Sequence, residues 1–216
     1  MRLVTRSRWW RERYPSWAAP VIGDVLDSDF GPVLWRRGRF TVHSRARWVL
    51  AAVVADDVLV VVAALVIEQA WLVVPVLLAT WWAFIVAPVV HELVHAFVAR
   101  RRGYTVVRFG LTGRGAFVTT VPAGGSSRPA DAVAILIAAP LTDIACALAL
   151  LAAASGTHGQ LFVLFVVAGV LQMVNGLANL MPLGGTDGGR TRVAFALARR
   201  SDDTRQRTAE PTLLLS

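Results

Sequence analysis

Long apolar runs alternate with short polar segments along most of this chain. Four of the runs are long enough to cross the roughly 30 Å hydrocarbon core of a bilayer, which takes about 20 helical residues. They cover residues 48–67, 71–99, 132–153 and 161–182. The pattern predicts an all-α polytopic membrane protein with about four transmembrane helices.

The segment after the second run has a different pattern. Residues 104–121, YTVVRFGLTGRGAFVTTV, are rich in valine, phenylalanine and threonine, with TGRG as a turn between two strand-like runs. Such a pattern predicts a small β-hairpin rather than a helix. We expect the hairpin to be associated with the membrane and its edge to be able to accept an added strand.

Composition agrees with a membrane protein. Hydrophobic residues make up 56% of the 216 residues and charged residues only 17%, which is too apolar for an ordinary soluble domain. All 22 basic residues are arginine and the formal net charge is +8, so a nucleic-acid partner has to be considered. The arginines form blocks between the apolar runs, as in loops that face an anionic cytoplasmic leaflet, and this placement argues against nucleic acid.

The arginine blocks also predict the orientation of the chain. Ten arginines precede the first run, six lie between the second and third, six follow the fourth, and the other two links have none. The positive-inside rule then places both termini in the cytoplasm. The lysine-free, arginine-rich composition is typical of a GC-rich bacterial genome, so we expect a multi-pass protein of a bacterial cell membrane.

These features divide the chain into four parts. They are a basic cytoplasmic arm (1–47), an extra transmembrane helix (48–67), a membrane core (71–192) and a cytoplasmic tail (193–216) that we expect to be partly disordered.

Two aspartates complicate the first run. Asp56 and Asp57 lie in its middle, where the apolar residues contribute roughly −5 kcal/mol to insertion and two central acids cost about 5 to 7 kcal/mol. Alone, the run would insert only marginally. Either neighbouring helices or a water-filled cavity shelter the pair, or the pair belongs to a proton or water route. We favour shelter, because no partner is visible in the sequence.

The second run ends in HELVH, residues 91–95, followed closely by three arginines. On a helix, residues i and i+4 share a face, so His91 and His95 can offer their imidazoles to one zinc ion while Glu92 addresses a water beside it. At 1.5 Å per residue, His91 lies about 30 Å from Trp71, at the cytoplasmic edge of the membrane core. Pro88 cannot donate a backbone hydrogen bond and is expected to kink the helix just before the motif, which would open room for water beside the metal. An ordinary membrane-helix proline without such a role is an equally good interpretation.

Two histidines leave a catalytic zinc ion short of one protein ligand, since such sites usually have three. The fourth run ends in NGLANLMPLGGTDGGR, in which Asp187 lies on the cytoplasmic side by the arginine count. A carboxylate on a glycine-flanked turn is well placed to reach a neighbouring helix end. Taken alone, TDGG is better explained as an ordinary turn.

HELVH and NLMPLGGTDGG together resemble the site-2 proteases, intramembrane zinc metalloproteases that cleave other proteins within or beside their membrane segments. That family has H-E-x-x-H on one membrane helix and a stretch like N-L-L-P-I-P-P-L-D-G-G on a later one. This chain keeps the spacing of five of its residues: Asn179, Pro182, Asp187, Gly188 and Gly189. The family's prolines and leucine are replaced by Gly184, Gly185 and Thr186, which predicts a looser loop before Asp187.

Between the two motifs, IAAPLTDIACAL is similar to the family's A-G-P-L-x-N, with Asp143 in place of the asparagine. The resemblance covers residues 71–192 and implies one zinc ion per chain, held by His91, His95 and Asp187. It also implies that Glu92 is the catalytic general base, and that the substrate is a transmembrane protein in the lipid bilayer.

Three further polar residues are candidates for the cavity or for substrate contact: Asn175, Asn179 and Asp143. The two asparagines are four residues apart on the fourth run, and hydrogen bonds between membrane helices explain Asn175 equally well. We therefore predict a zinc-dependent intramembrane endopeptidase. The alternatives are a non-catalytic membrane binding or assembly protein of the same fold and a membrane metal carrier.

Overall fold

The computed structural model describes residues 33–112, 115–123, 128–183 and 186–196. Its helices and strands follow the apolar runs of the sequence closely. The elements of the apolar runs are α4 (Ala46–Val66), η1 (Ala70–Leu72), α5 (Val73–Trp81), η2 (Trp82–Val86), α6 (Ala87–Arg101), α7 (Pro129–Ala154) and α8 (Gly159–Leu180). A further helix, described over residues 187–196, follows α8.

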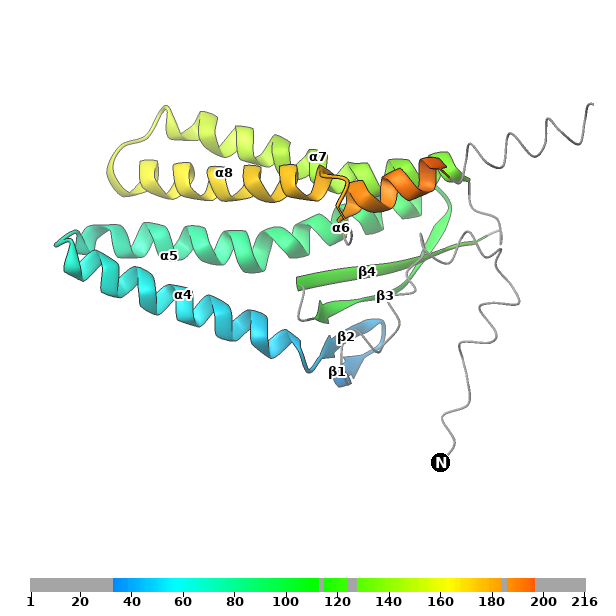
Figure 1. Cartoon of the computed structure of the whole chain (residues 1–216), viewed down its shortest axis with the longest axis horizontal. Coiled ribbons are helices and arrows are strands. Elements are labelled where there is room, and N and C mark those ends of the chain that lie inside the picture. Colours follow the sequence, from blue (N-terminus) through cyan, green and yellow to red (C-terminus); the bar gives the residue numbers. More distant parts are fainter. Residues whose placement is uncertain (1–32, 113–114, 124–127, 184–185, 197–216) are drawn as a thin grey trace, which may run out of the picture.

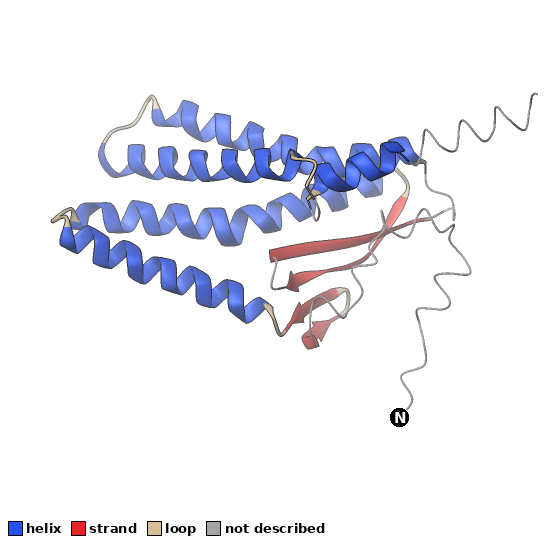
Figure 2. Cartoon of the chain, in the orientation of Figure 1, coloured by secondary structure: helices blue, strands red, loops and turns tan. Residues whose placement is uncertain are grey.

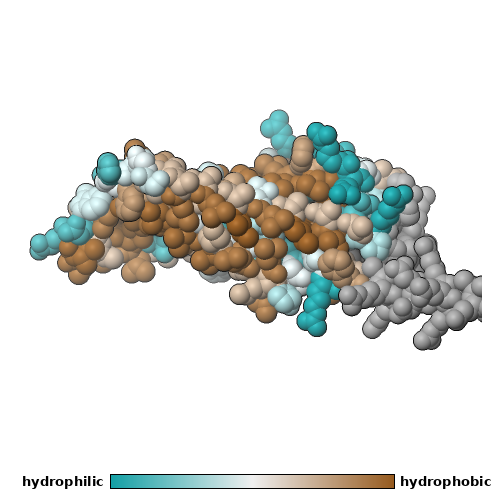
Figure 3. Space-filling view, turned by 90° about the horizontal axis from the view of Figure 1, so that it is seen from above, coloured by the Kyte–Doolittle hydropathy of each residue, from teal (hydrophilic) through white to brown (hydrophobic). Residues whose placement is uncertain are grey.

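The predicted fold class is confirmed. Four helices are long and apolar enough to cross a membrane: Ala46–Val66, Ala70–Arg101, Pro129–Ala154 and Gly159–Leu180. Each span agrees with its predicted range to within about three residues. The space-filling view shows apolar side chains over the long helical body, with hydrophilic ones mainly toward its ends (Figure 3). This distribution suits a helix bundle surrounded by lipid.

The helices lie side by side, with the continuous α5–α6 rod between α4 and the α7–α8 pair (Figure 1). Their contacts use small residues, since Ala79, Ala139, Ala147 and Ala168 are among the most buried side chains. Small side chains let helix backbones approach closely, which is how helices pack in lipid, where no hydrophobic force drives them together.

A π-helical turn, η2, joins α5 to α6. Pro88 lies in the first turn of α6 and has no backbone N–H, so one carbonyl of the preceding turn loses its usual partner. A π-turn is a common way to absorb such a defect. The helix is therefore locally widened just before HELVH, and the kink expected at Pro88 stays a prediction.

The β-structure is larger than expected. The predicted hairpin is confirmed as β3 (Tyr104–Thr112) and β4 (Gly115–Pro122), which pair antiparallel. Two strands of the basic arm, β1 (Val33–Arg37) and β2 (Phe40–His43), extend it to a sheet with the order β1-β2-β3-β4. Because β2 runs parallel to β3, this sheet ties the arm to the segment after α6 (Figure 2).

The sequence did not predict β1 and β2, because both strands are short and lie within an arginine-rich segment that is typical of a polar arm. The sheet lies beside α6 and next to the start of α4 (Figure 1). Most of the arm, the glycines Gly184 and Gly185, and the tail beyond residue 196 lie outside the described residues. The predicted disorder of the tail and looseness of the glycine loop therefore remain predictions.

Candidate metal centre

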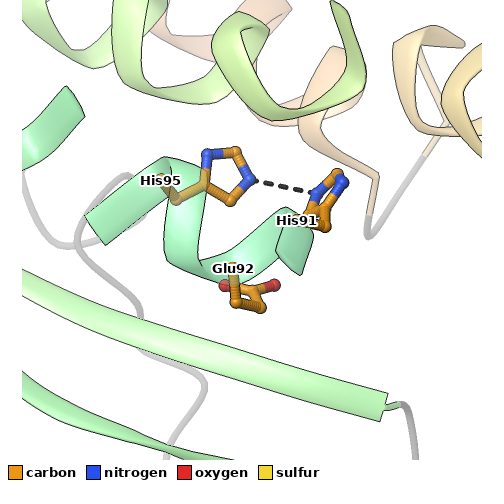
Figure 4. Close-up of side chains that lie close together, drawn as sticks. All are labelled: His91, Glu92 and His95. Atoms are coloured by element: carbon orange, nitrogen blue, oxygen red, sulfur yellow. Dashed lines mark hydrogen bonds between the residues drawn. The ribbon is translucent and has the colours of Figure 1, made fainter. Parts of the chain in front are cut away.

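Two histidines of α6 face the same point inside the molecule. His91 and His95 are one helical turn apart, and each is only 5% exposed. Their rings meet edge to face with centroids 4.7 Å apart, and their Nε2 atoms are 3.1 Å apart (Figure 4). The i, i+4 spacing has therefore placed both rings on one face of the helix, as the sequence predicts.

Asp187 comes from the other end of the core and meets the same point. Its Oδ2 lies 2.9 Å from His91 Nε2 and 3.1 Å from His95 Nε2. The carboxylate is 6% exposed. Three potential ligand atoms thus form a nearly equilateral triangle, although 92 or more residues separate Asp187 from the histidines along the chain.

Local backbone structure explains how Asp187 reaches this point. Thr186 precedes the helix of residues 187–196, and its Oγ1 accepts a hydrogen bond from Gly189 N at 3.1 Å, the usual arrangement of an N-cap. A Cβ at Gly188 would lie 2.1 Å from Leu180 O, and a Cβ at Gly189 would lie 1.9 Å from Leu183 O. Only glycine permits this approach, so the TDGG sequence brings the helix start, with Asp187 in its first turn, against the end of α8.

The outer nitrogens of both histidines have partners on α7. His91 Nδ1 is 2.6 Å from Asp143 Oδ2, and His95 Nδ1 is 2.7 Å from the carbonyl oxygen of Ile135. A carbonyl or carboxylate oxygen only accepts hydrogen bonds, so each Nδ1 carries a proton and donates it. The two Nε2 atoms face each other and Asp187, and in a neutral imidazole with its proton on Nδ1 they are the nitrogens that carry the lone pair.

This arrangement fits a metal ion. A proton on one Nε2 could form a hydrogen bond to only one of the other two atoms at a time. A metal cation can interact with all three atoms at once. Zinc binds histidine nitrogen and carboxylate oxygen at about 2.0 to 2.2 Å with tetrahedral geometry, which separates neighbouring ligand atoms by about 3.3 to 3.5 Å. The separations of 2.9 to 3.1 Å are only a few tenths of an ångström shorter. A small outward movement would accommodate zinc.

Asp187 is suited to be the anionic ligand. Burial by itself raises the pKa of this carboxyl group, but its interactions with His91 and His95 outweigh burial and lower the pKa below its ordinary range. Arg190, one turn further along the helix, places Nη1 3.6 Å from Asp187 Oδ1. The aspartate is therefore ionised at neutral pH, with its second oxygen turned toward a cation.

Glu92 lies next to the two histidines on α6. One carboxylate oxygen and one nitrogen from each ring lie within 4.8 Å of one another, a separation that a single water molecule can bridge. In Figure 4 the Glu92 side chain lies on the side of the helix facing the strands, below the two imidazoles. It is half-buried, so it combines proximity to the histidines with some access from outside.

The other predicted polar residues lie together on α7 and α8. Asn175 Nδ2 donates to Asp143 Oδ2 at 3.2 Å, and Asn179 Nδ2 lies 3.5 Å from Asn175 Oδ1. Asp143 is 1% exposed and contacts His91, so its surroundings are those of a partner for His91 rather than of an open cavity wall. Asn179 is half-buried and extends this row toward the end of α8.

Several partners of these residues are not predicted by the sequence pattern. Gln172 donates to Asp143 Oδ1 at 2.7 Å, and its position three residues before Asn175 on one helix face was a usable signal. The carbonyl of Ile135 left no such signal, because every residue has one. Thr186 was treated only as a replacement within the family motif, although threonine before a helix is a recognisable cap.

The sequence matches no known family model and no curated protein. Among solved structures, the site-2 protease from Methanocaldococcus jannaschii is similar, with a TM-score of 0.47 and 22% sequence identity. The match covers 75% of this chain and 69% of that one.

Proposed function

We propose that this chain is a zinc-dependent intramembrane endopeptidase that cleaves membrane-protein substrates near the cytoplasmic side of the bilayer. The carrying observation is the triangle of His91 Nε2, His95 Nε2 and Asp187 Oδ2, with edges of 2.9 to 3.1 Å and a glutamate beside it. Three protein ligands with one further position free are typical of catalytic rather than structural zinc sites. The resemblance of HELVH and NLMPLGGTDGG to the site-2 protease motifs supports the same activity.

His91, His95 and Asp187 would hold the metal, one ion per chain. When bound, zinc supplies Lewis-acid polarisation of the scissile carbonyl and lowers the pKa of water toward ~7. The two α7 partners, Asp143 and the Ile135 carbonyl, keep the imidazoles in the tautomer that exposes Nε2.

Glu92 would move the proton. In peptide hydrolysis, the oxygen of a water molecule adds to the carbonyl carbon and the C–N bond breaks. The Glu92 carboxylate accepts one proton from that water and later delivers it to the nitrogen of the leaving segment, so the glutamate ends the cycle unchanged. Its distance of at most 4.8 Å from the histidine nitrogens suits a group that acts through one water.

The substrate in this proposal is a transmembrane protein that reaches the site in an extended form, because helical carbonyls are hydrogen-bonded and enclosed. Strand β4 is suited to receive it: β4 packs against α6 and, among the described residues, pairs only with β3. Its other edge can offer backbone hydrogen bonds to an added strand. Replacing Val118 or Thr119 by proline should lower cleavage and leave zinc content unchanged; equal cleavage in both variants would refute the role of this edge.

In the bilayer, the site would face the cytoplasm with both chain ends on that side, as the arginine blocks predict. Cysteine labelling of position 68, between α4 and η1, and of position 103, after α6, tests this orientation. A membrane-impermeant reagent applied to intact cells should reach position 68 and not position 103.

The chief alternative is a non-catalytic protein that keeps the metal and serves as a binding or assembly partner. Glu92 discriminates between the two, since a purely structural metal does not need a carboxylate within reach of its ligands. A metal carrier is disfavoured by the described residues, because their histidine and carboxylate ligands converge at one depth instead of marking a route across the membrane.

The decisive experiment compares Glu92→Gln with the wild type and with Glu68→Gln, a matched control in the link between α4 and η1. Each protein is purified in detergent, its zinc is measured, and it is incubated with a panel of single-span membrane proteins. We expect about one zinc per chain in all three and cleavage lost only in Glu92→Gln. Equal cleavage by Glu92→Gln, or no zinc in the wild type, would refute the proposal.

A further inference from the structure

A row of polar side chains, which begins at the half-buried Trp82 and is otherwise buried, crosses the helix bundle and ends at His91. Trp82 Nε1 donates to Gln172 Oε1 at 3.1 Å, Gln172 Nε2 donates to Asp143 Oδ1 at 2.7 Å, and His91 Nδ1 donates to Asp143 Oδ2 at 2.6 Å. The row begins in η2, the π-turn before α6, and passes through α8 and α7. Asp143 is its centre, because it is the member that links the other helices to His91.

The surroundings of Asp143 suit a carboxylate. Gln172 and Asn175 donate N–H groups to its two oxygens, and His91 Nδ1 lies 2.6 Å from Oδ2, so each oxygen has a neighbour from which a carboxylate can accept a hydrogen bond. The group is 1% exposed. Placing a carboxylate there costs several kcal/mol unless an opposite charge compensates it. An asparagine of nearly the same size would avoid that cost, and the site-2 protease motif has asparagine at this position.

A divalent cation at the three ligand atoms supplies the missing compensation. Zinc with one ligand carboxylate, Asp187, would have a net charge of +1, and the Asp143 carboxylate behind His91 would reduce that charge to zero. Glu92 and Arg190, which also lie beside the ligands, have opposite charges when both are ionised and leave this sum unchanged. A neutral assembly is far easier to bury in a membrane core than a charged one. A bound metal would therefore offset the cost of burying the Asp143 carboxylate.

The packing of α7 on α8 is built around this contact. A Cβ at Gly176 would lie 3.0 Å from Asp143 Cβ and 2.9 Å from Ile144 Cγ1, closer than side chains normally approach. Glycine at this position therefore lets α8 come near enough for Gln172 and Asn175 to reach the carboxylate. His95 has a simpler arrangement, since its Nδ1 donates to the neutral carbonyl of Ile135.

We propose that Asp143 is the positioning residue of this metal centre: its carboxylate holds His91 in the Nδ1–H tautomer and orientation that bind the ion, and it neutralises the charge of the loaded site. Such a carboxylate–histidine–metal arrangement strengthens the histidine as a ligand, and its loss typically costs 10- to 100-fold in metal affinity. The inference rests on the proposed metal ligands, but it does not require the protein to be a protease.

Two substitutions separate this role from simple packing. Asp143→Asn keeps the volume and one acceptor oxygen but removes the charge, whereas Asp143→Leu removes every acceptor. Asp57→Asn, in α4, is the matched control for losing a carboxylate inside a membrane span. All are made in the full-length chain, and their folding is compared by thermal unfolding in detergent.

Three measurements are made on these proteins. Zinc affinity is measured against a competing chelator, and the visible absorption of the cobalt(II)-loaded protein reports the ligand geometry. The ¹⁵N chemical shifts of labelled histidine in the metal-free protein report the tautomer of His91, with a His91→Gln sample to assign its signals. The tautomer measurement needs neither metal nor cleavage.

We expect zinc affinity to fall about 10-fold in Asp143→Asn and up to about 100-fold in Asp143→Leu, with a changed cobalt spectrum and a mixed His91 tautomer in Asp143→Leu. Asp57→Asn should match the wild type. If Asp143→Asn binds zinc as tightly as the wild type, the charge of Asp143 has no role and the inference is overturned. It is also overturned if His91 keeps the Nδ1–H tautomer in Asp143→Leu. Absence of zinc from the wild type would instead refute the proposed metal site itself.

Discussion

Two regions of the molecule each hold a carboxylate inside a candidate membrane span, and they treat it differently. Asp143 of α7 is 1% exposed and both of its oxygens accept hydrogen bonds. Asp57 of α4 is half-buried and accepts one hydrogen bond, from Trp81 Nε1 at 2.9 Å. Its other oxygen has no hydrogen-bond partner in the part of the chain that the structure describes.

The difference distinguishes an acid that serves a site from one that joins two helices. Both oxygens of Asp143 have hydrogen-bond partners because α7 and α8 pack closely and because residues of α6 and α8 reach the carboxylate. One of these partners, His91, is a candidate metal ligand. At Asp57 the single donor from α5 satisfies one oxygen, while the other is buried without a hydrogen-bond partner among the described residues. Trp81 is the kind of neighbour that the shelter interpretation of Asp56 and Asp57 required. Acids inside a membrane span are functional candidates by default. Of the two, we regard Asp143 as the stronger candidate, because both of its oxygens have hydrogen-bond partners and Asp57 has only one such oxygen.

The largest effect should come from disturbing the tight packing that places Asp187. In Gly188→Ala, the new methyl group would lie 2.1 Å from Leu180 O, so the helix start must move and carry Asp187 away from the histidines. Loss of a direct ligand should lower zinc affinity by more than the roughly 100-fold expected for an outer partner. Chelator competition measures this change.

Gly156→Ala is the matched control. It lies in the link between α7 and α8, where an added Cβ meets nothing closer than Ala153 O at 3.9 Å. It should bind zinc like the wild type. Unchanged zinc affinity in Gly188→Ala would mean that the position of Asp187 does not depend on this packing. The claim that close packing distinguishes the candidate metal site from the Asp57 contact of α4 would then be wrong.

Sequence patterns predict the helices and the candidate ligands His91 and His95, because apolar runs and an i, i+4 spacing are repetitive or local features. Apolar runs of about 20 residues define the spans, and the spacing of His91 and His95 is a property of one helix turn. Asp187 could be predicted only because the arginine count placed it on the same side of the membrane as the histidines and because it lies in a recognisable motif. Partners that depend on the fold were not predictable: the Ile135 carbonyl has no sequence signature, and β1 and β2 form strands because β3 is available for β2 to pair with.

A smaller effect is expected where the packing is tight but no ligand moves. Gly176→Ala would place a methyl group 3.0 Å from Asp143 Cβ, separating α7 from α8 by a few tenths of an ångström. Overpacking of this kind costs about 1 to 3 kcal/mol of stability, and weaker support of Asp143 should lower zinc affinity by up to about 10-fold.

Thermal unfolding and chelator competition measure the two effects of Gly176→Ala, again beside Gly156→Ala. A loss of stability with no change in affinity would show that Gly176 serves only helix packing. The link between that packing and the support of His91 would then be wrong.

The smallest effect on function should follow from removing the other acid. Asp57→Leu loses the hydrogen bond from Trp81, worth about 0.6 to 1.7 kcal/mol, and removes an aspartate whose insertion costs about 3 kcal/mol. The protein should therefore unfold at the same or a slightly higher temperature, with zinc affinity and cleavage within about twofold of the wild type, as expected for independent sites. Asp143→Leu should show the opposite pattern in the same assays. A tenfold loss of cleavage in Asp57→Leu with zinc retained would instead place Asp57 on a proton or water route, because only a chemical role would lower the rate without disturbing the metal.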